Sequence, residues 1–168
     1  RAHAGRCGVC ASEAAGGLGR GIEFARPIVA EAGRLRLQWP LLETILVAKA
    51  LGDSPLAAEL AGGGRVATWA LQGNLQDGVA GQARHARQCD WALVADGQGG
   101  AALVDLASVE IQDDAALDPD YPQAWLVLDN AKVLATLDAA AFSALQRDSH
   151  VLIAGLVNGA AEGALNTT

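Results

Sequence analysis

The stretch 91–105 reads WALVADGQGGAALVD and decides what the middle of this chain is. An apolar run over 91–95 leads into the glycine-rich break at 96–100, and a second run follows over 101–105. Two short apolar runs around such a break predict a β-hairpin. The segments on both sides of it have helical patterns. The expected order is therefore helices, a small β domain, and helices again.

Composition limits the classes of partner. The chain has 168 residues, of which 51% are hydrophobic, which is enough for one ordinary domain or two small ones. The net charge of −7 leaves no basic stripe, which argues against nucleic acid and against an anionic membrane surface. No apolar run reaches the roughly 18 residues of a membrane-spanning helix, so we expect a soluble protein.

The numbers of cysteine and methionine residues indicate the redox compartment and whether the sequence is part of a longer protein. Three cysteines are an odd number and make no secreted disulfide framework, which favours a reduced, cytoplasmic setting. The sequence contains no methionine, and its last residues continue a helical pattern. We interpret it as an excerpt of a longer protein.

Residues 1–64 are expected to form a helical segment. Apolar residues recur at helical spacing from Ile22, with Gly33 as a stop, and Pro27 predicts a kink or a later start. A buried helix is expected over 41–51. Ser54 as N-cap with a proline in the first turn predicts a further helix over 55–61.

Residues 65–135 are expected to form the β domain, and 136–168 the start of a helical bundle. The fold class is α+β, with a small, antiparallel, barrel-like middle domain. The alternative is one compact α+β domain. Strands are expected at 66–71, 75–83, 91–95, 101–105, 109–111, 125–129 and 133–135. A helical turn or two is expected over 138–145, and one long helix from about Asp148.

Two motifs near the N-terminus have ordinary explanations. Cys7 and Cys10 form a CxxC, but a structural zinc needs about four ligands and a redox pair needs a βαβ setting. Two packed small residues are favoured. The glycine loop 17–21 precedes a helix without the strand and the full spacing that a phosphate cradle requires, so a flexible helix entry is favoured.

Two charged clusters and one further histidine are candidates for ligand chemistry. Arg84, His85 and Arg87 are a positive cluster that either faces solvent or contacts a ligand phosphate or ring edge. The aspartates at 113, 114, 118 and 120 lack the spacing of a calcium loop, so a solvated acidic loop is favoured. His150 is expected at the surface or as a cap. No serine has the GxSxG context of a hydrolase.

The order of these pieces resembles the acyl-CoA dehydrogenase family. Glu13 and the glycines at 16–19 resemble its loop before a helix that ends, here, in Glu31-Ala32-Gly33-Arg34. The segment 40–44, PLLET, resembles the start of the next helix, and 60–71 resembles the crossing into the β domain. Leu75-Gln76-Asp77-Gly78 before Asp90, and the helix over 152–165, resemble the register that follows.

The resemblance implies FAD and an acyl-CoA substrate. In that family a Glu base takes a proton from Cα while hydride leaves Cβ for the flavin, and a carbonyl held by hydrogen bonds acidifies the proton. It also implies a homo- or hetero-oligomer and permits an electron-transfer flavoprotein as acceptor. The catalytic Glu lies beyond residue 168 or, in some members, near Ser149, beside Asp148. No catalytic residue and no metal ligand is therefore predicted in this chain.

The same resemblance places the cofactor-binding residues at Trp69, Leu71, Gln72, Arg84 and His85. The family's Thr-Glu-Pro flavin loop maps to Gln72-Gly73-Asn74, with no Gly-Ser-Asp after it. Its Trp-Ile-Thr or Trp-Ile-Ser segment maps to 82–84. Two functions follow: an FAD-dependent acyl-CoA dehydrogenase present here as an incomplete chain, or a non-catalytic subunit with a degenerate flavin site. Strand alternation predicts that one of Arg84 and His85 points inward.

Overall fold

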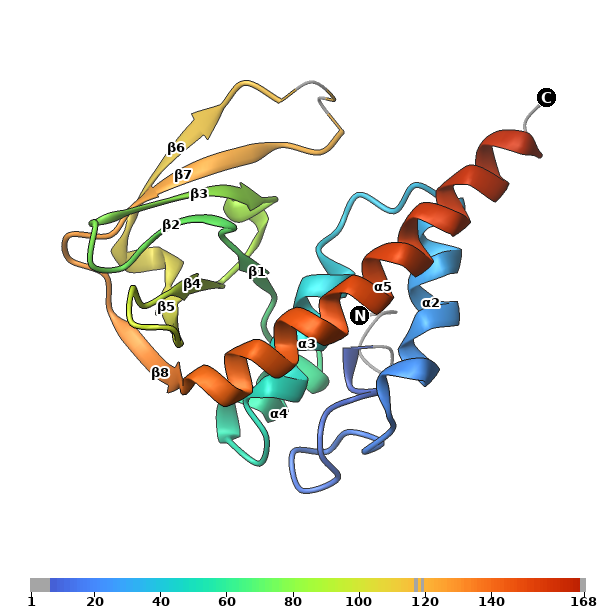
Figure 1. Cartoon of the computed structure of the whole chain (residues 1–168), viewed down its shortest axis with the longest axis horizontal. Coiled ribbons are helices and arrows are strands. Elements are labelled where there is room, and N and C mark those ends of the chain that lie inside the picture. Colours follow the sequence, from blue (N-terminus) through green and yellow to red (C-terminus); the bar gives the residue numbers. More distant parts are fainter. Residues whose placement is uncertain (1–6, 117, 119, 167–168) are drawn as a thin grey trace. The chain divides into compact units, whose positions relative to one another are not determined.

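The computed structural model describes residues 7–116, 118 and 120–166, and the chain divides into two compact units (Figure 1). One is helical and comprises the residues up to Gly64 together with those from Ala144 onward. The other, Arg65–Ser143, contains all the strands. We refer to them as the helical unit and the β unit. No helix among the described residues is both long and apolar enough to cross a membrane.

The short helices of the helical unit begin where local chemistry predicts. They are α2 (Ile22–Arg34), α3 (Leu41–Ala50) and α4 (Pro55–Ala61). The hydroxyl of Ser54 accepts the N–H of Leu56 at 3.0 Å, and Pro55 occupies the first turn of α4, so the predicted cap is confirmed. In α3 the residues from Leu41 to Ala48 are all buried, as predicted for this segment.

Helix α2 begins before Pro27 and ends just after Gly33. It continues from Ile22 through Pro27 to Arg34, so the later start predicted at Pro27 is wrong. Gly33 is therefore inside the helix. A Cβ placed on Gly33 would overlap the backbone carbonyl oxygen of Leu156, so this glycine serves a close helix contact and not a stop.

The partner in that contact is the long helix α5 (Ala139–Leu165). Gly155, Gly159 and Gly163 recur every four residues on its face toward α2. A Cβ on Gly159 would overlap the backbone of Ala30, and one on Gly163 would lie 2.5 Å from the carbonyl oxygen of Arg34. The α2–α5 contact thus brings two helix backbones together at positions where no side chain fits. The separate helical turn predicted over 138–145 is part of this one helix.

The β unit consists of two four-stranded sheets, with strand orders β1-β4-β5-β8 and β2-β3-β7-β6. The strands β1 and β4 are parallel and the other pairs antiparallel. The strands are β1 (Ala67–Trp69), β2 (Gln72–Asn74), β3 (Val79–Arg84), β4 (Trp91–Ala95), β5 (Ala101–Asp105), β6 (Glu110–Asp114), β7 (Gln123–Val127) and β8 (Val133–Leu137). The predicted α+β class is confirmed; the middle part is two mostly antiparallel sheets and not a closed barrel.

The predicted hairpin is confirmed as β4 and β5, which pair from Trp91 with Asp105 to Ala95 with Ala101. The carboxylate of Asp96 closes the turn by accepting the backbone N–H of Gln98 and of Gly100. Turn residues of this type replace missing ladder hydrogen bonds with side-chain ones. The turn residues of the hairpin therefore help to fix the register in which β4 and β5 pair.

The single strand predicted over 75–83 is wrong. Strand β2 ends at Asn74, a turn follows, and β3 begins at Val79. The side chain of Asn74 accepts the N–H of Asp77 at 2.9 Å, and Gly78 has a φ of +72°. Asn and Gly in these roles make a tight turn that the apolar pattern does not reveal.

The core between the sheets is made largely of small residues. Ala80, Ala83, Ala92, Ala102 and Ala124 are buried in it. Its larger members are Val94, Val104, Leu106, Leu126 and Leu128. Because alanine adds little thickness, the strands can pack closely without a void.

Candidate functional site

The edge at which the resemblance places the cofactor is the passage from β1 to β2. Trp69 ends β1 and Gln72 begins β2, so only Ala70 and Leu71 separate these two strands, which belong to different sheets. The N–H of Leu71 donates to the carbonyl of Gly81 at 3.0 Å, and Gln72 pairs with that same glycine. The chain therefore crosses from one sheet into the other without forming a loop.

Strand β3 runs along this crossing and ends in an unusual turn. The hydroxyl of Thr68 in β1 donates to the carbonyl of Arg84 at 2.7 Å. The N–H of His85 donates to the carbonyl of Pro122 at 2.9 Å. His85 has left-handed backbone angles (φ 52°, ψ 26°) and precedes the 3₁₀ helix η1 (Ala86–Gln88). Few residues other than glycine adopt such angles, which redirect the chain at the end of β3.

The five predicted cofactor residues lie on neighbouring strands but differ in exposure. Trp69 and His85 are buried, at 6% and 4% exposed. Leu71 is 56% exposed, and Gln72 and Arg84 are also exposed. The structure thus brings 69–72 beside 81–85, with the side chains of Arg84 and His85 in different environments.

The imidazole of His85 is held neutral. Burial lowers its pKa below the ordinary 6.5, and the neighbouring positive charge of Arg84 lowers it further. Its ring lies against Tyr121, with ring centroids 5.9 Å apart and planes inclined by 58°. Within the described part of the chain, its Nδ1 is a buried atom with no hydrogen-bond partner. A buried polar atom of this kind costs free energy unless something satisfies it.

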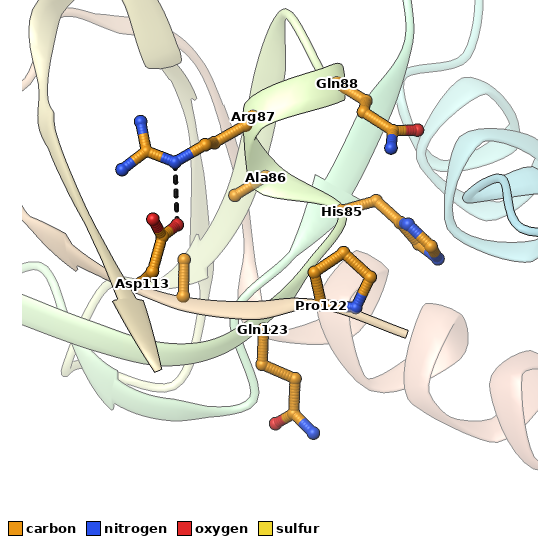
Figure 2. A pocket seen from close by; sticks show the side chains of 8 residues that line it. His85, Ala86, Arg87, Gln88, Asp113, Pro122 and Gln123 are labelled. Carbon is orange, nitrogen blue, oxygen red and sulfur yellow. Dashed lines mark hydrogen bonds and ion pairs between the residues drawn. The ribbon is translucent and has the colours of Figure 1, made fainter. Parts of the chain in front are cut away.

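A small pocket lies beside this histidine. Figure 2 shows it, with Arg87 and Asp113 on one side and His85 and Gln88 on the other. Its volume is about 190 Å³, and all of its lining residues belong to the β unit. The lining comprises His85, Ala86, Arg87, Gln88, Asp113, Pro122, Gln123 and Ala124.

The charged residues of the pocket form an ion pair. The Nε of Arg87 donates to Asp113 at 2.7 Å, and its Nη2 donates to the carbonyl of Ile111 at 3.0 Å. The hydrogen bond from Arg87 lowers the pKa of the Asp113 carboxyl. The sequence predicts Arg87 as a candidate ligand contact but not Pro122 or Gln123. These two residues reach the pocket through strand pairing, which no local sequence pattern indicates.

The two cysteines of the CxxC are unreactive. Cys7 and Cys10 are buried and unbonded to each other, and burial raises the pKa of each thiol to about 11. A thiol with such a pKa is almost entirely protonated at neutral pH. This environment suits the favoured prediction of two packed small residues.

The glycine loop uses its own backbone. The N–H groups of Leu18, Gly19 and Arg20 donate to the carbonyls of Gly8, Ala11 and Val9, at 2.8–3.0 Å. A phosphate cradle needs free amides at this position. These amides are already engaged, in line with the favoured prediction of a helix entry.

The positions considered for a base or a cation are locally satisfied. Asp148 pairs with Lys49, and the hydroxyl of Ser149 donates to the carbonyl of Gln146. Asp118 accepts the N–H of Asp120 within its own turn. In the residues that the structure describes, no three metal-ligating side chains cluster together.

The two segments that the resemblance assigns to the flavin have a regular local structure. Residues 72–74, which take the place of the family's Thr-Glu-Pro, form strand β2 and lead into the turn before β3. The segment 82–84 has no hydroxyl, and the hydroxyl of Thr68 donates to the carbonyl of Arg84. Other residues therefore replace the two sequence signatures of the family's flavin site.

Comparison with known proteins identifies the fold. No protein-family model matches the chain, and no curated protein matches it in sequence. Among solved structures, a variant of the steroid acyl-CoA dehydrogenase Tcur3481-Tcur3483 matches with a TM-score of 0.81 and 22% identity. That match covers 99% of this chain and 54% of the other.

Two further structures match in the same way. The ChsE4-ChsE5 complex from Mycobacterium tuberculosis has a TM-score of 0.77 and 22% identity, over 98% of this chain and 53% of that one. Butyryl-CoA dehydrogenase from Megasphaera elsdenii has a TM-score of 0.77 and 15% identity, over 96% and 56%. The chain spans about half the length of these structures. The predicted resemblance is confirmed in the fold: over nearly its whole length, this chain is folded as an acyl-CoA dehydrogenase.

Proposed function

We propose that the whole protein is a subunit of an acyl-CoA dehydrogenase-type oligomer that carries out α,β-dehydrogenation of an acyl-CoA thioester with FAD. The observation that carries this proposal is the match to acyl-CoA dehydrogenases across both the helical and the β unit. Fatty or steroid acyl groups are the substrate class. An electron-transfer flavoprotein is the proposed acceptor, and three cysteines that form no disulfide suit a cytoplasmic setting.

A second candidate has its own observation in favour. The segment 72–74, which the resemblance assigns to the flavin loop, is strand β2 in this chain and runs directly into the turn before β3. A subunit built this way serves the oligomer as a structural companion, with the redox chemistry on another chain. Fold and function separate readily in this manner, because chemistry depends on local sites and the fold does not.

Flavin content distinguishes the two candidates. The full-length protein, expressed alone, is titrated with FAD and assayed with an artificial electron acceptor over several acyl-CoA lengths. A yellow protein with robust turnover supports the dehydrogenase. A colourless protein that acquires flavin and turnover only when co-expressed with a second subunit supports the companion. An assembly that binds neither FAD nor acyl-CoA would contradict both.

Arg84 and His85 allow a finer test in any FAD-containing form. Since His85 is buried and Arg84 exposed, we expect His85→Ala to weaken FAD binding more than Arg84→Ala. If neither raises the dissociation constant by more than about threefold, on the order of 0.6–0.7 kcal/mol, neither residue is a cofactor contact.

A further inference from the structure

Strand β6 (Glu110–Asp114) forms an open edge of its sheet. In the strand order β2-β3-β7-β6 it stands last, and within the described part of the chain it pairs with β7 alone. Four of its five residues are exposed. The free backbone N–H and C=O groups of such an edge can pair with a strand of another molecule, which leads to association or aggregation. An edge of this kind therefore needs protection if copies of the chain are to stay apart.

The backbone hydrogen bonds of β7 identify the groups of β6 that face this edge. The N–H of Leu128 donates to the carbonyl of Gly78 at 2.7 Å, so the alternate residues 124, 126 and 128 direct their backbone groups toward β3. The residues between them bond the opposite neighbour, and they face the even-numbered residues of β6. Ile111 and Asp113 therefore direct their own N–H and C=O groups away from β7, to the open edge.

Arg87 reaches the open edge from the 3₁₀ helix η1. Its Nη2 donates to the carbonyl of Ile111 at 3.0 Å. Its Nε donates to the carboxylate of Asp113 at 2.7 Å, which Figure 2 shows. The guanidinium is thus held by the two residues whose backbone faces outward, and charge-assisted hydrogen bonds of this kind are stronger than neutral ones. An added strand would have to displace Arg87 before its own N–H could reach the carbonyl of Ile111.

Negative charge forms a second barrier at the same edge. Glu110, Asp113 and Asp114 make three of the five residues of β6 acidic. If two copies of β6 paired in antiparallel fashion about Gln112, Ile111 of each would exchange hydrogen bonds with Asp113 of the other. The same register places Glu110 opposite Asp114, and like charges directly opposite each other are destabilising. Salt screens this repulsion, so the two barriers can be separated by experiment.

We propose that Arg87 closes the β6 edge and prevents β6 from pairing with β6 of a second copy of this chain. The side chains of Arg87 and Asp113 are 59% and 70% exposed, so their ion pair contributes little to folding. Its place on an outward-facing carbonyl gives it the role of keeping copies apart. The proposal goes beyond the proposed function, because it involves neither a flavin nor a thioester.

The test measures the weight-average mass of the full-length protein by sedimentation at about 100 μM protein and about 0.5 M NaCl, where surface charges are largely screened. Because the Arg87 pair is exposed, Arg87→Ala should fold as wild type does. We expect this variant to reach at least about twice the mass of the wild-type protein. Arg34→Ala is the matched control, since it removes the same charge and breaks an exposed ion pair with Glu31 on α2. Its mass should equal that of wild type.

A second substitution tests whether β6 is the strand that pairs. The N–H of Asp113 points to the open edge, so Asp113→Pro removes no hydrogen bond between β6 and β7 but deletes a donor that a second strand would use. We expect the double variant, Arg87→Ala with Asp113→Pro, to return to the wild-type mass. If it does not fold, Ile111→Pro deletes the other outward-facing N–H and serves the same purpose. The proposal is overturned if Arg87→Ala keeps the wild-type mass, or if the double variant associates as strongly as the single one.

Discussion

The α2–α5 contact and the β2–β3 hairpin both depend on glycine, but the two glycines serve different purposes. At the first, Gly159 lets two helix backbones meet and so maintains the helical packing. At the second, Gly73 in β2, with a φ of +72°, lets this strand approach the carbonyl of Val79 at the start of β3. The first glycine serves packing within the helical unit, whereas the second lies in the segment that the family resemblance assigns to the flavin loop. The comparison therefore separates a residue that maintains the fold from one at a position where a functional site is expected.

The largest effect is expected at the α2–α5 contact. In Gly159→Ala the new Cβ meets the backbone of Ala30, which cannot rotate away. We expect a loss of about 2–3 kcal/mol in the free energy of unfolding, although alanine by itself favours a helix by about 1 kcal/mol. Urea denaturation measures it.

Gly155→Ala is the matched control for this contact. Its new Cβ would meet Cγ of Arg26, part of a flexible side chain, at 3.1 Å and the carbonyl oxygen of Arg26 at 3.3 Å, whereas at Gly159 it would overlap the backbone of Ala30. We expect a change within about 0.5 kcal/mol of wild type or a slight gain in stability. Equal losses at the two positions would show that backbone approach is not what Gly159 provides.

A smaller effect is expected at the β2–β3 hairpin. Gly73→Ala combines a left-handed φ with a clash against the carbonyl of Val79, so we expect a loss of about 1–3 kcal/mol. Gly16→Ala is the control, because it has the same left-handed φ with nothing within 4 Å. The difference between the two variants, read from thermal unfolding, isolates the clash. A Gly73→Ala protein as stable as Gly16→Ala would mean that the hairpin can open at this point.

The next effect is a pH dependence from His85. Because its folded pKa is depressed below 6.5, the unfolded state binds more protons as the pH falls. The contribution of the neutral histidine is therefore complete above about pH 6.5 and is lost as the pH falls through the lowered pKa of the folded state. His85→Gln should flatten the pH dependence of stability in this window, as followed by denaturation at several pH values. His150→Gln, the same substitution at an exposed position of α5, is the matched control.

The smallest effect is expected for Arg87→Gln. The pair with Asp113 is exposed on both sides, and exposed pairs contribute little to folding. We expect a melting temperature within about 1 °C of wild type. A larger drop would show that the Arg87 pair stiffens the pocket beyond what its exposure suggests.

Local chemistry predicted much of the fold. Ser54 and Pro55 gave the start of α4, and the apolar runs around 96–100 gave β4 and β5, because caps and turns are encoded within a few residues. The failures involve tertiary contacts or a concealed turn. Gly33 resembled a helix stop because nothing in its neighbourhood reveals α5, and the strand predicted over 75–83 ran across Asp77-Gly78, a dipeptide typical of turns.

The candidate site was less accessible to prediction. The cluster of Arg84, His85 and Arg87 could be recognised as charged residues in an acidic chain. Which of them is buried, and which pairs with Asp113, depends on how β3, β6 and β7 align. The lining by Pro122 and Gln123 is likewise a product of strand pairing. Spacing along the sequence carries no record of it.

The two buried cysteines make it possible to measure how often the helical unit opens. While Cys7 and Cys10 stay covered, with pKa values of about 11, an alkylating reagent finds almost no thiolate to attack. Each excursion that uncovers them restores ordinary thiol reactivity. The alkylation rate at each of these two cysteines, followed by the gain in mass, then measures how often this part of the molecule opens. No introduced label is needed. The partly exposed Cys89 in the β unit serves as the internal reference.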